Sequence, residues 1–410
     1  MRNTRLVDKG GQMEETLREY FLDLGYYVVR GIKYGFEGFD ITDVDLWLYQ
    51  RGSSFSRQRF NVDIKHKRSP QALERVLWAK GLQQCLNLDG ALVATTDMRK
   101  AVKKFADQND VVLLDGAMIG KLKQRYGKGT GRISEEELIH LARGAKNDRV
   151  GTDWLNRIDA AKSRVLSQLD FDGFNALLID TRFFASEMIT DAHRREAACR
   201  FFYFSLSLLV IVLDFIARDF AFIDKQLQSD VLDDGFRFGK IGKHGAEKVF
   251  ATASKIVSAC FPGERARSVE FIKQLRTESM NLQAEVLTEF FLKANHGKAL
   301  FDFARSFESA AYARELTVPA VLSGEQRGLI SVILDFHGID RKKFFDSLAA
   351  TPSAKESKTS SELAQSDDKA GQIPRQSELN IESSPSEQPI LKKANLAGDS
   401  VSVKEPPLGP

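Results

Sequence analysis

Apolar positions near the start of the chain recur at the spacing of a helix. Between residues 12 and 24 they form a single stripe, which predicts an amphipathic helix with that stripe facing a core. Gly25 follows and is typical of a helix end. The stripe consists of Met13, Leu17, Tyr20, Phe21 and Leu24.

Other segments of the first 115 residues have the patterns of strands. Two of them alternate apolar and polar residues, which is typical of strands with one apolar face, and three are short apolar runs suited to buried strands. The predicted strands are 26–29, 43–49, 61–67, 91–94 and 111–114.

Helices are predicted between the later strands. Ser69-Pro70 places Ser at an N-cap and Pro at the first helical position, and Leu73, Val76 and Leu77 then predict a buried face. The resulting order is helix, three strands, helix, strand, helix, strand. It predicts an α/β domain with a mixed central sheet over residues 1–125.

The remainder of the chain divides into three further segments. We predict a Gly-rich linker at 126–133, an all-α domain of unknown role at 134–348 and a disordered tail at 349–410. No aromatic residue follows Thr351, and seven of the ten prolines do. The uncharged run 201–213 is thirteen residues long, too short to span a membrane, and predicts a buried core helix.

Composition allows large cores and places the positive charge at one end. The chain is 43% apolar with a net charge of +3, but residues 1–125 hold 21 Lys and Arg against 16 Asp and Glu, a net of +5. Such an excess favours a partner that carries phosphates.

The three cysteines are far apart and the N-terminus has no apolar segment, so we expect a cytoplasmic protein without a zinc cage or an integral membrane segment.

Two predicted strands carry acids on the face opposite their apolar residues. Asp45 alternates with Val44 and Leu46, and Asp63 and Lys65 alternate with Val62 and Ile64. Antiparallel pairing of these strands brings Asp45 beside Asp63. Two carboxylates at one place repel unless a cation lies between them, which predicts a Mg²⁺ (or Mn²⁺) site. Lys65 would stabilise negative charge on a phosphate oxygen.

Glu14 is the acid of the first helix that can join this group. In helical projection it lies about 75° from the apolar stripe at 100° per residue, whereas Glu15 lies nearly opposite. Glu14 therefore reaches inward and Glu15 does not. A surface ion pair with Arg18, four residues on, is the alternative interpretation of Glu14.

Basic residues flank the second acidic strand. Arg57 and Arg59 precede Asp63, and Lys67 and Arg68 follow Lys65. They predict contacts to the phosphates on both sides of a cleaved bond, which position a nucleic acid without reading its sequence. The alternative is a solvated, charged loop.

A family resemblance connects these motifs. Gly11-Gln12-Met13-Glu14, Asp43-Val44-Asp45-Leu46, Val62-Asp63-Ile64-Lys65 and the later Gln83-Gln84 together resemble the PD-(D/E)xK restriction-endonuclease-like superfamily. Residues 90–116 look in particular like the Mrr-type catalytic domain of type IV restriction enzymes. The resemblance covers about residues 8–125.

The resemblance implies a restriction-endonuclease-like fold and Mg²⁺-dependent cleavage of DNA. Asp45, Asp63 and Lys65 would be the catalytic core, with Glu14 assisting at the metal. Gln83 or Gln84 would lie near the substrate, although an ordinary amide on a helix surface is the alternative for both.

Three hypotheses for function follow. The first is an endonuclease that cuts DNA in defence against foreign DNA and works as a homodimer. The second is a non-catalytic nucleic-acid-binding module on the same fold. The third is a scaffold in which the helical domain binds a protein partner or a membrane surface.

Overall fold

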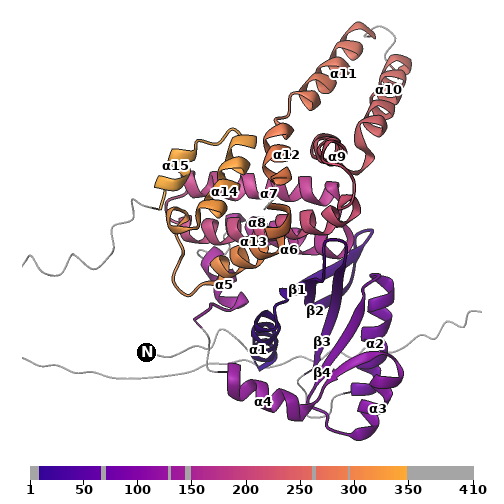
Figure 1. The fold of residues 1–410 in the computed structure, drawn as a ribbon, viewed down its shortest axis with the longest axis vertical. Helices are drawn as coiled ribbons and strands as arrows, with labels where there is room; N and C mark the ends of the chain where they lie inside the picture. The colour runs from indigo at the N-terminus through magenta and orange to yellow at the C-terminus, as the bar shows by residue number, and fades with distance from the viewer. Residues whose placement is uncertain are drawn as a thin grey trace, which may run out of the picture. The chain divides into compact units, whose positions relative to one another are not determined.

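The computed structural model describes residues 9–65, 71–127, 131–143, 149–260, 265–293 and 296–348. They form an N-terminal region built on a five-stranded mixed sheet, followed by a mostly helical region (Figure 1). The coarse architecture predicted from the sequence is thus confirmed. The predicted tail at 349–410 and part of the predicted linker, 128–130, lie outside the described residues.

The sheet has the strand order β1-β2-β3-β4-β5. β1 pairs with β2 and β2 with β3 in antiparallel fashion, whereas β3–β4 and β4–β5 are parallel. The antiparallel pairing predicted for the two acidic strands is confirmed. The strands are β1 (Tyr27–Phe36), β2 (Phe39–Arg51), β3 (Arg57–Lys65), β4 (Gly90–Thr95) and β5 (Val111–Leu114).

Helices cover both faces of this sheet, because successive residues of each strand point to opposite faces. Leu46, Val62 and Leu92 belong to the cluster packed with α1 and α4, whereas Ala91 and Val93 belong to the cluster packed with α2 and α3. Each face thus has its own apolar layer. The helices are α1 (Lys9–Asp23), α2 (Ala72–Cys85), α3 (Lys100–Gln108) and α4 (Gly116–Tyr126).

The buried face of α2 differs from the predicted one. Leu73 and Leu77 are exposed, whereas Ala72, Val76 and Ala79 are buried. Small residues face the sheet here because α2 lies close to β3 and β4 and also contacts α3. The predicted cap at Ser69-Pro70 lies outside the described residues.

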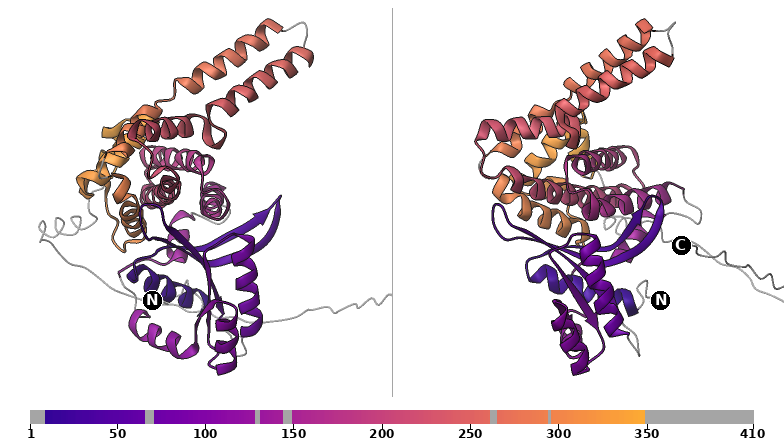
Figure 2. Two further views of the ribbon diagram at one scale, coloured as in Figure 1. Left: turned by 45° about the vertical axis from the view of Figure 1, so that its right-hand side comes forward. Right: turned by 90° about the vertical axis from the view of Figure 1, so that its right-hand side faces the viewer.

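The helical region is organised around α8, whose residues 197–216 are all buried. This confirms the core helix predicted for 201–213. The helix is long and apolar enough to cross a membrane, but its apolar window is buried inside the protein, as in a soluble core helix. The helices are α5 (Glu135–Ala142), α6 (Arg149–Ser167), α7 (Phe171–Thr190), α8 (Arg195–Ala217), α9 (Lys225–Phe238), α10 (Gly242–Cys260), α11 (Arg265–Met280), α12 (Ala284–Leu292), α13 (His296–Tyr312), α14 (Gly324–Phe336) and α15 (Arg341–Asp346), with 3₁₀ turns η1 (Arg218–Phe220), η2 (Gly239–Ile241) and η4 (Pro319–Val321). α10 and α11 lie side by side and extend away from the other helices (Figure 2).

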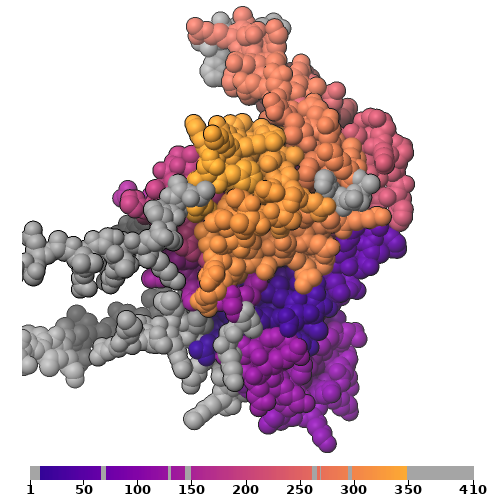
Figure 3. Space-filling view, turned by 60° about the vertical axis from the view of Figure 1, so that its left-hand side comes forward, coloured from indigo at the N-terminus to yellow at the C-terminus, as the bar shows by residue number. Residues whose placement is uncertain are grey.

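The sheet and the helical region share one apolar core. Trp47 and Tyr49 of β2 belong to the same buried cluster as α7, α8 and α13. Tyr27 of β1 hydrogen-bonds to Ser207 of α8 with an oxygen–oxygen distance of 2.7 Å. In Figure 3 the orange surface of the helical region lies directly against the indigo surface of the N-terminal region. β1 and β2 are therefore packed on both faces.

Candidate active site

Asp45 lies where the antiparallel pairing of β2 and β3 ends. Leu46 opposite Val62 is the last registered pair, so Asp45 and Asp63 are the next residues on the two strands. Oδ2 of Asp45 accepts a hydrogen bond of 2.6 Å from the backbone N–H of Ile64. The Asp45 carboxylate therefore takes the place of a backbone partner beside Asp63.

The environment of Asp45 disfavours its charge. Burial raises the pKa of Asp45 from 3.8 to about 6, and the nearby charge of Glu14 adds to the rise. The hydrogen bond from Ile64 and the positive charges of Lys65 and Arg75 lower the pKa and only partly offset burial. Such a carboxylate gains from a further cation, or from a proton that it can exchange near neutral pH.

Asp63 is buried and paired with a residue of α2. Nε of Arg75 donates to Oδ2 of Asp63 at 2.7 Å, and the terminal nitrogen of Arg75 donates to Oδ1. Burial lowers the pKa of Arg75, while the charge of Asp45 raises it. Arg75 thus places a positive charge close to both strand acids.

Lys65 is the last residue of β3 and is half-buried. No ion pair of Lys65 occurs among the contacts of the described residues, although its charge is one of those that lower the pKa of Asp45. Its ammonium group is therefore near the acids without being neutralised by a direct partner there.

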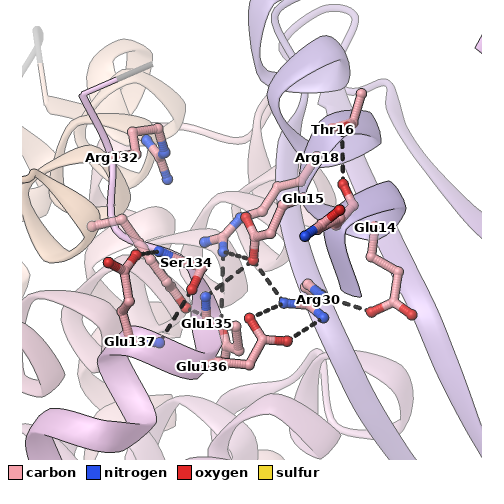
Figure 4. Close-up of polar contacts among 12 residues, drawn as sticks. Glu14, Glu15, Thr16, Arg18, Arg30, Arg132, Ser134, Glu135, Glu136 and Glu137 are labelled. Atoms are coloured by element: carbon pink, nitrogen blue, oxygen red, sulfur yellow. Dashed lines mark hydrogen bonds and ion pairs between the residues drawn. The ribbon is translucent and has the colours of Figure 1, made fainter. Parts of the chain in front are cut away.

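Glu14 approaches the site from α1 and is held by β1. Nε of Arg30 donates to Oε2 of Glu14 at 2.7 Å (Figure 4). The charge of Glu14 is one of the causes that raise the pKa of Asp45. The alternative pairing of Glu14 with Arg18 does not occur, because Arg18 is buried against Glu308 at 2.7 Å.

The prediction that Glu15 faces away from the protein interior is wrong. Its carboxylate accepts hydrogen bonds from Arg30 at 2.8 Å and from the backbone N–H of Glu135 in α5 at 3.0 Å. α1 is therefore covered by the sheet on one side and by the helical region on the other (Figure 4), and the apolar stripe reports only the first side.

The donor set of the site is acidic but sparse. Within the described ranges, no group of three or more His, Cys, Asp or Glu side chains is arranged to hold a metal ion. Asp63 is bound by Arg75 and Glu14 by Arg30, so two of the three predicted metal ligands, Asp45, Asp63 and Glu14, already have an arginine partner.

The predicted phosphate contacts have different environments. Arg57 is buried, and its Nε donates to Oδ2 of Asp214 in α8 at 2.6 Å. It is fixed inside the protein and does not fit the predicted role. Arg59 is half-buried and donates to the carbonyl oxygen of Asn87 at 2.6 Å. Lys67 and Arg68 lie outside the described residues.

The two glutamines are at the other end of α2. Gln83 follows Arg75 by eight residues, which corresponds to about 12 Å along a helix. Its Nε2 donates to the carbonyl oxygen of Leu88 at 3.3 Å, and Gln84 is exposed. Neither is brought to the acids, in agreement with the alternative of ordinary helix amides.

Two arginines of the site were not predicted from the sequence. Arg30 and Arg75 bind Glu14 and Asp63 across 16 and 12 residues. The only available signal was their place on elements next to the acidic strands, which many other residues share.

Comparisons with family models, curated proteins and solved structures find no match for this chain. The superfamily resemblance therefore rests on the residues named above.

Proposed function

We propose that the protein is a metal-dependent endonuclease that hydrolyses phosphodiester bonds of DNA, with a restriction-endonuclease-like N-terminal region. The observation that carries this proposal is Asp45, whose pKa of about 6 reflects a carboxylate with unbalanced charge next to Asp63 and Lys65. Structural carboxylates normally have their charge compensated. A carboxylate whose charge is only partly compensated, beside a lysine, is a candidate for a catalytic site.

The residues present suit a hard divalent cation in their chemistry. Mg²⁺ prefers carboxylate oxygens, keeps several waters and needs only one or two protein carboxylates. Asp45 and Asp63 would hold it, and Asp63 would exchange Arg75 for the ion. Mg²⁺ or Mn²⁺, when bound, supplies a Lewis acid and lowers the pKa of a coordinated water.

The side chains of the protein would then act on the phosphate. Lys65 would neutralise charge that develops on a non-bridging oxygen as water adds to phosphorus and one P–O ester bond breaks. The attacking water releases a proton as its oxygen bonds to phosphorus, and the leaving oxygen takes up a proton from solvent in its place. Glu14, which Arg30 holds, would add negative charge beside Asp45 and assist at the metal. Lys67 and Arg68 would contact the neighbouring phosphates.

Substitution of Lys65 provides the test. Lys65→Ala should lower the rate of plasmid nicking in Mg²⁺ or Mn²⁺ by about 100-fold or more, as for loss of one charge-stabilising donor. Lys104→Ala, which removes an exposed lysine of α3, serves as the matched control and should cut like wild type. Supercoiled plasmid, single-stranded DNA and RNA should be compared, each with and without EDTA. Equal cutting by the Lys65 variant would refute the assignment.

A non-catalytic DNA-binding module is the second candidate, favoured by the Arg75–Asp63 pair, which neutralises one acid with a protein cation in place of a metal. This candidate predicts salt-sensitive DNA binding without any product in Mg²⁺, Mn²⁺ or Co²⁺. Product formation that requires a divalent ion and Lys65 would exclude it.

The biological setting belongs to the proposal as well. A nuclease of this kind would act in defence against foreign DNA, and cutting of both strands favours a homodimer. Light scattering of the purified chain tests the homodimer, and a monomer would contradict it.

A further inference from the structure

A second site lies at the other end of the strands that carry Asp45 and Asp63. A cavity of about 350 Å³ is formed where the β2–β3 loop meets α8, α9, α12 and α13. This volume is at the lower end of the range for small-molecule sites. Its lining includes the cationic side chains Arg51, Arg57, Lys225, Lys293 and Lys298.

The charge of this cavity is strongly one-sided. No acidic side chain is among the described residues that line it. The carboxylate of Asp214, buried beneath, is bound by Arg51 at 2.9 Å and by Arg57 at 2.6 Å, so it compensates one positive charge of five.

The three lysines remain for an incoming ligand. In the part of the chain that the structure describes, none of Lys225, Lys293 and Lys298 forms an ion pair through its side chain. Like charges that converge on one cavity repel, and an anion with more than one negative charge relieves that repulsion. Lysines bind phosphate as point charges without the two-point geometry that arginine offers to carboxylates.

The floor of the cavity is apolar. Leu213 of α8, Leu232 of α9, Phe291 of α12 and Leu300 of α13 line it, and all four side chains are buried. Phe220 of η1 adds a half-buried ring. A small inorganic anion would leave this surface without a partner, whereas a ligand with an apolar body covers it.

We propose that this cavity binds a small phosphorylated molecule whose phosphates contact Lys225, Lys293 and Lys298 and whose apolar or planar body packs on the floor. Two sources share this chemistry, a nucleoside phosphate and a phosphorylated acyl chain. The proposal does not depend on the nuclease assignment, because it uses other residues.

Calorimetric titration of the full chain tests the site with ATP, dodecyl phosphate and inorganic pyrophosphate. Wild type should bind ATP or dodecyl phosphate at least tenfold more tightly than pyrophosphate, and the tighter of the two identifies the source. The variant Lys225→Glu/Lys293→Glu/Lys298→Glu should weaken that binding at least tenfold. The control Lys248→Glu/Lys255→Glu/Lys342→Glu changes the net charge equally at exposed sites and should bind like wild type.

The contrary outcomes are distinct. No binding of ATP or dodecyl phosphate by wild type, or equal binding by the cavity variant and the control, would overturn the site. Pyrophosphate binding as tight as that of both larger ligands would overturn the role of the apolar floor. Phe220→Ala should weaken binding of the larger ligand and leave binding of pyrophosphate unchanged. The reverse pattern would contradict the proposed orientation of the ligand.

Discussion

A buried or half-buried aspartate lies at each end of the β2–β3 pair, and the two carboxylates differ in how their charge is balanced. At one end Asp214 of α8 accepts hydrogen bonds from Tyr49 at 2.6 Å, Arg51 at 2.9 Å and Arg57 at 2.6 Å. At the other end Asp45 accepts one from a backbone N–H, and burial raises its pKa to about 6.

The difference separates a structural carboxylate from a candidate functional one. Asp214 joins the sheet to the helical region, and Arg51 and Arg57 bind it at that junction. The charge of Asp45 costs free energy in the folded state and yields no comparable junction. A folded protein retains such a cost where function requires it.

Removal of the Asp214 carboxylate gives the largest expected effect on stability. Asp214→Ala leaves Arg57 buried without its partner, and loss of one member of a buried pair costs about 3–5 kcal/mol. Urea unfolding followed by circular dichroism measures the loss. Asp214→Asn retains hydrogen-bond acceptance and should lose less. A change below about 1 kcal/mol for the Ala variant would show that the junction does not depend on this pair.

Neutralisation of Asp45 should have the opposite sign. Asp45→Asn keeps an oxygen for the N–H of Ile64 and removes the buried charge, so the free energy of unfolding at pH 8 should rise by on the order of 1–3 kcal/mol. The same variant should lose DNA cutting under the proposed function. Destabilisation at pH 8 would show that the Asp45 charge is compensated after all.

The pH dependence of this difference identifies its cause. Because the pKa of Asp45 is raised from 3.8 to about 6, the folded state keeps a proton that the unfolded state releases between these values. The contribution of Asp45 to stability therefore falls as pH rises from about 4 to about 6 and is constant above that range. The stability of wild type minus that of Asp45→Asn should follow this course at a series of pH values. A flat difference from pH 4 to 8 would exclude the raised pKa.

An exposed ion pair gives the smallest expected effect on stability and serves as a reference for the Asp214 and Asp45 variants. Lys33 of β1 lies 2.8 Å from Asp159 of α6, and the Lys33 side chain is 57% exposed. Lys33→Ala should change stability by at most about 1 kcal/mol, because solvent screens such pairs. The effect should vanish in 1 M salt. A loss of stability as large as that of Asp214→Ala would mean that burial does not explain the difference between the two ion pairs.

The order of elements could be predicted because each depends on local periodicity. The stripe from Met13 to Phe21 and the alternation around Asp63 each required only neighbouring residues, whereas Leu24, predicted as part of the stripe, is exposed. The face of α2 could not be predicted in the same way. Leu73 and Leu77 are exposed while Ala72 and Ala79 are buried, since close packing against β3 and β4 selects small side chains and periodicity reports only hydrophobicity.

The site was predicted in part for the same reason. Asp45, Asp63 and Lys65 follow from strand alternation and pairing. The roles of Arg57 and Arg75 do not, because their partners are Asp214, 157 residues away, and Asp63, on another element. The sequence shows that an arginine is positively charged and which residues adjoin it in the chain. It does not show which acid the fold places beside it.

The sequence by itself determined the order of helices and strands as far as β5, which strands carry acids, and that residues 201–213 form a buried helix. Only the tertiary structure decided that α1 is covered on two sides, that Arg57 is a buried structural residue, and that lysines from three helical segments converge on one cavity. Local patterns reflect interactions over a few residues. Charge compensation depends on groups brought together from distant segments, and their free energies are set by burial and distance.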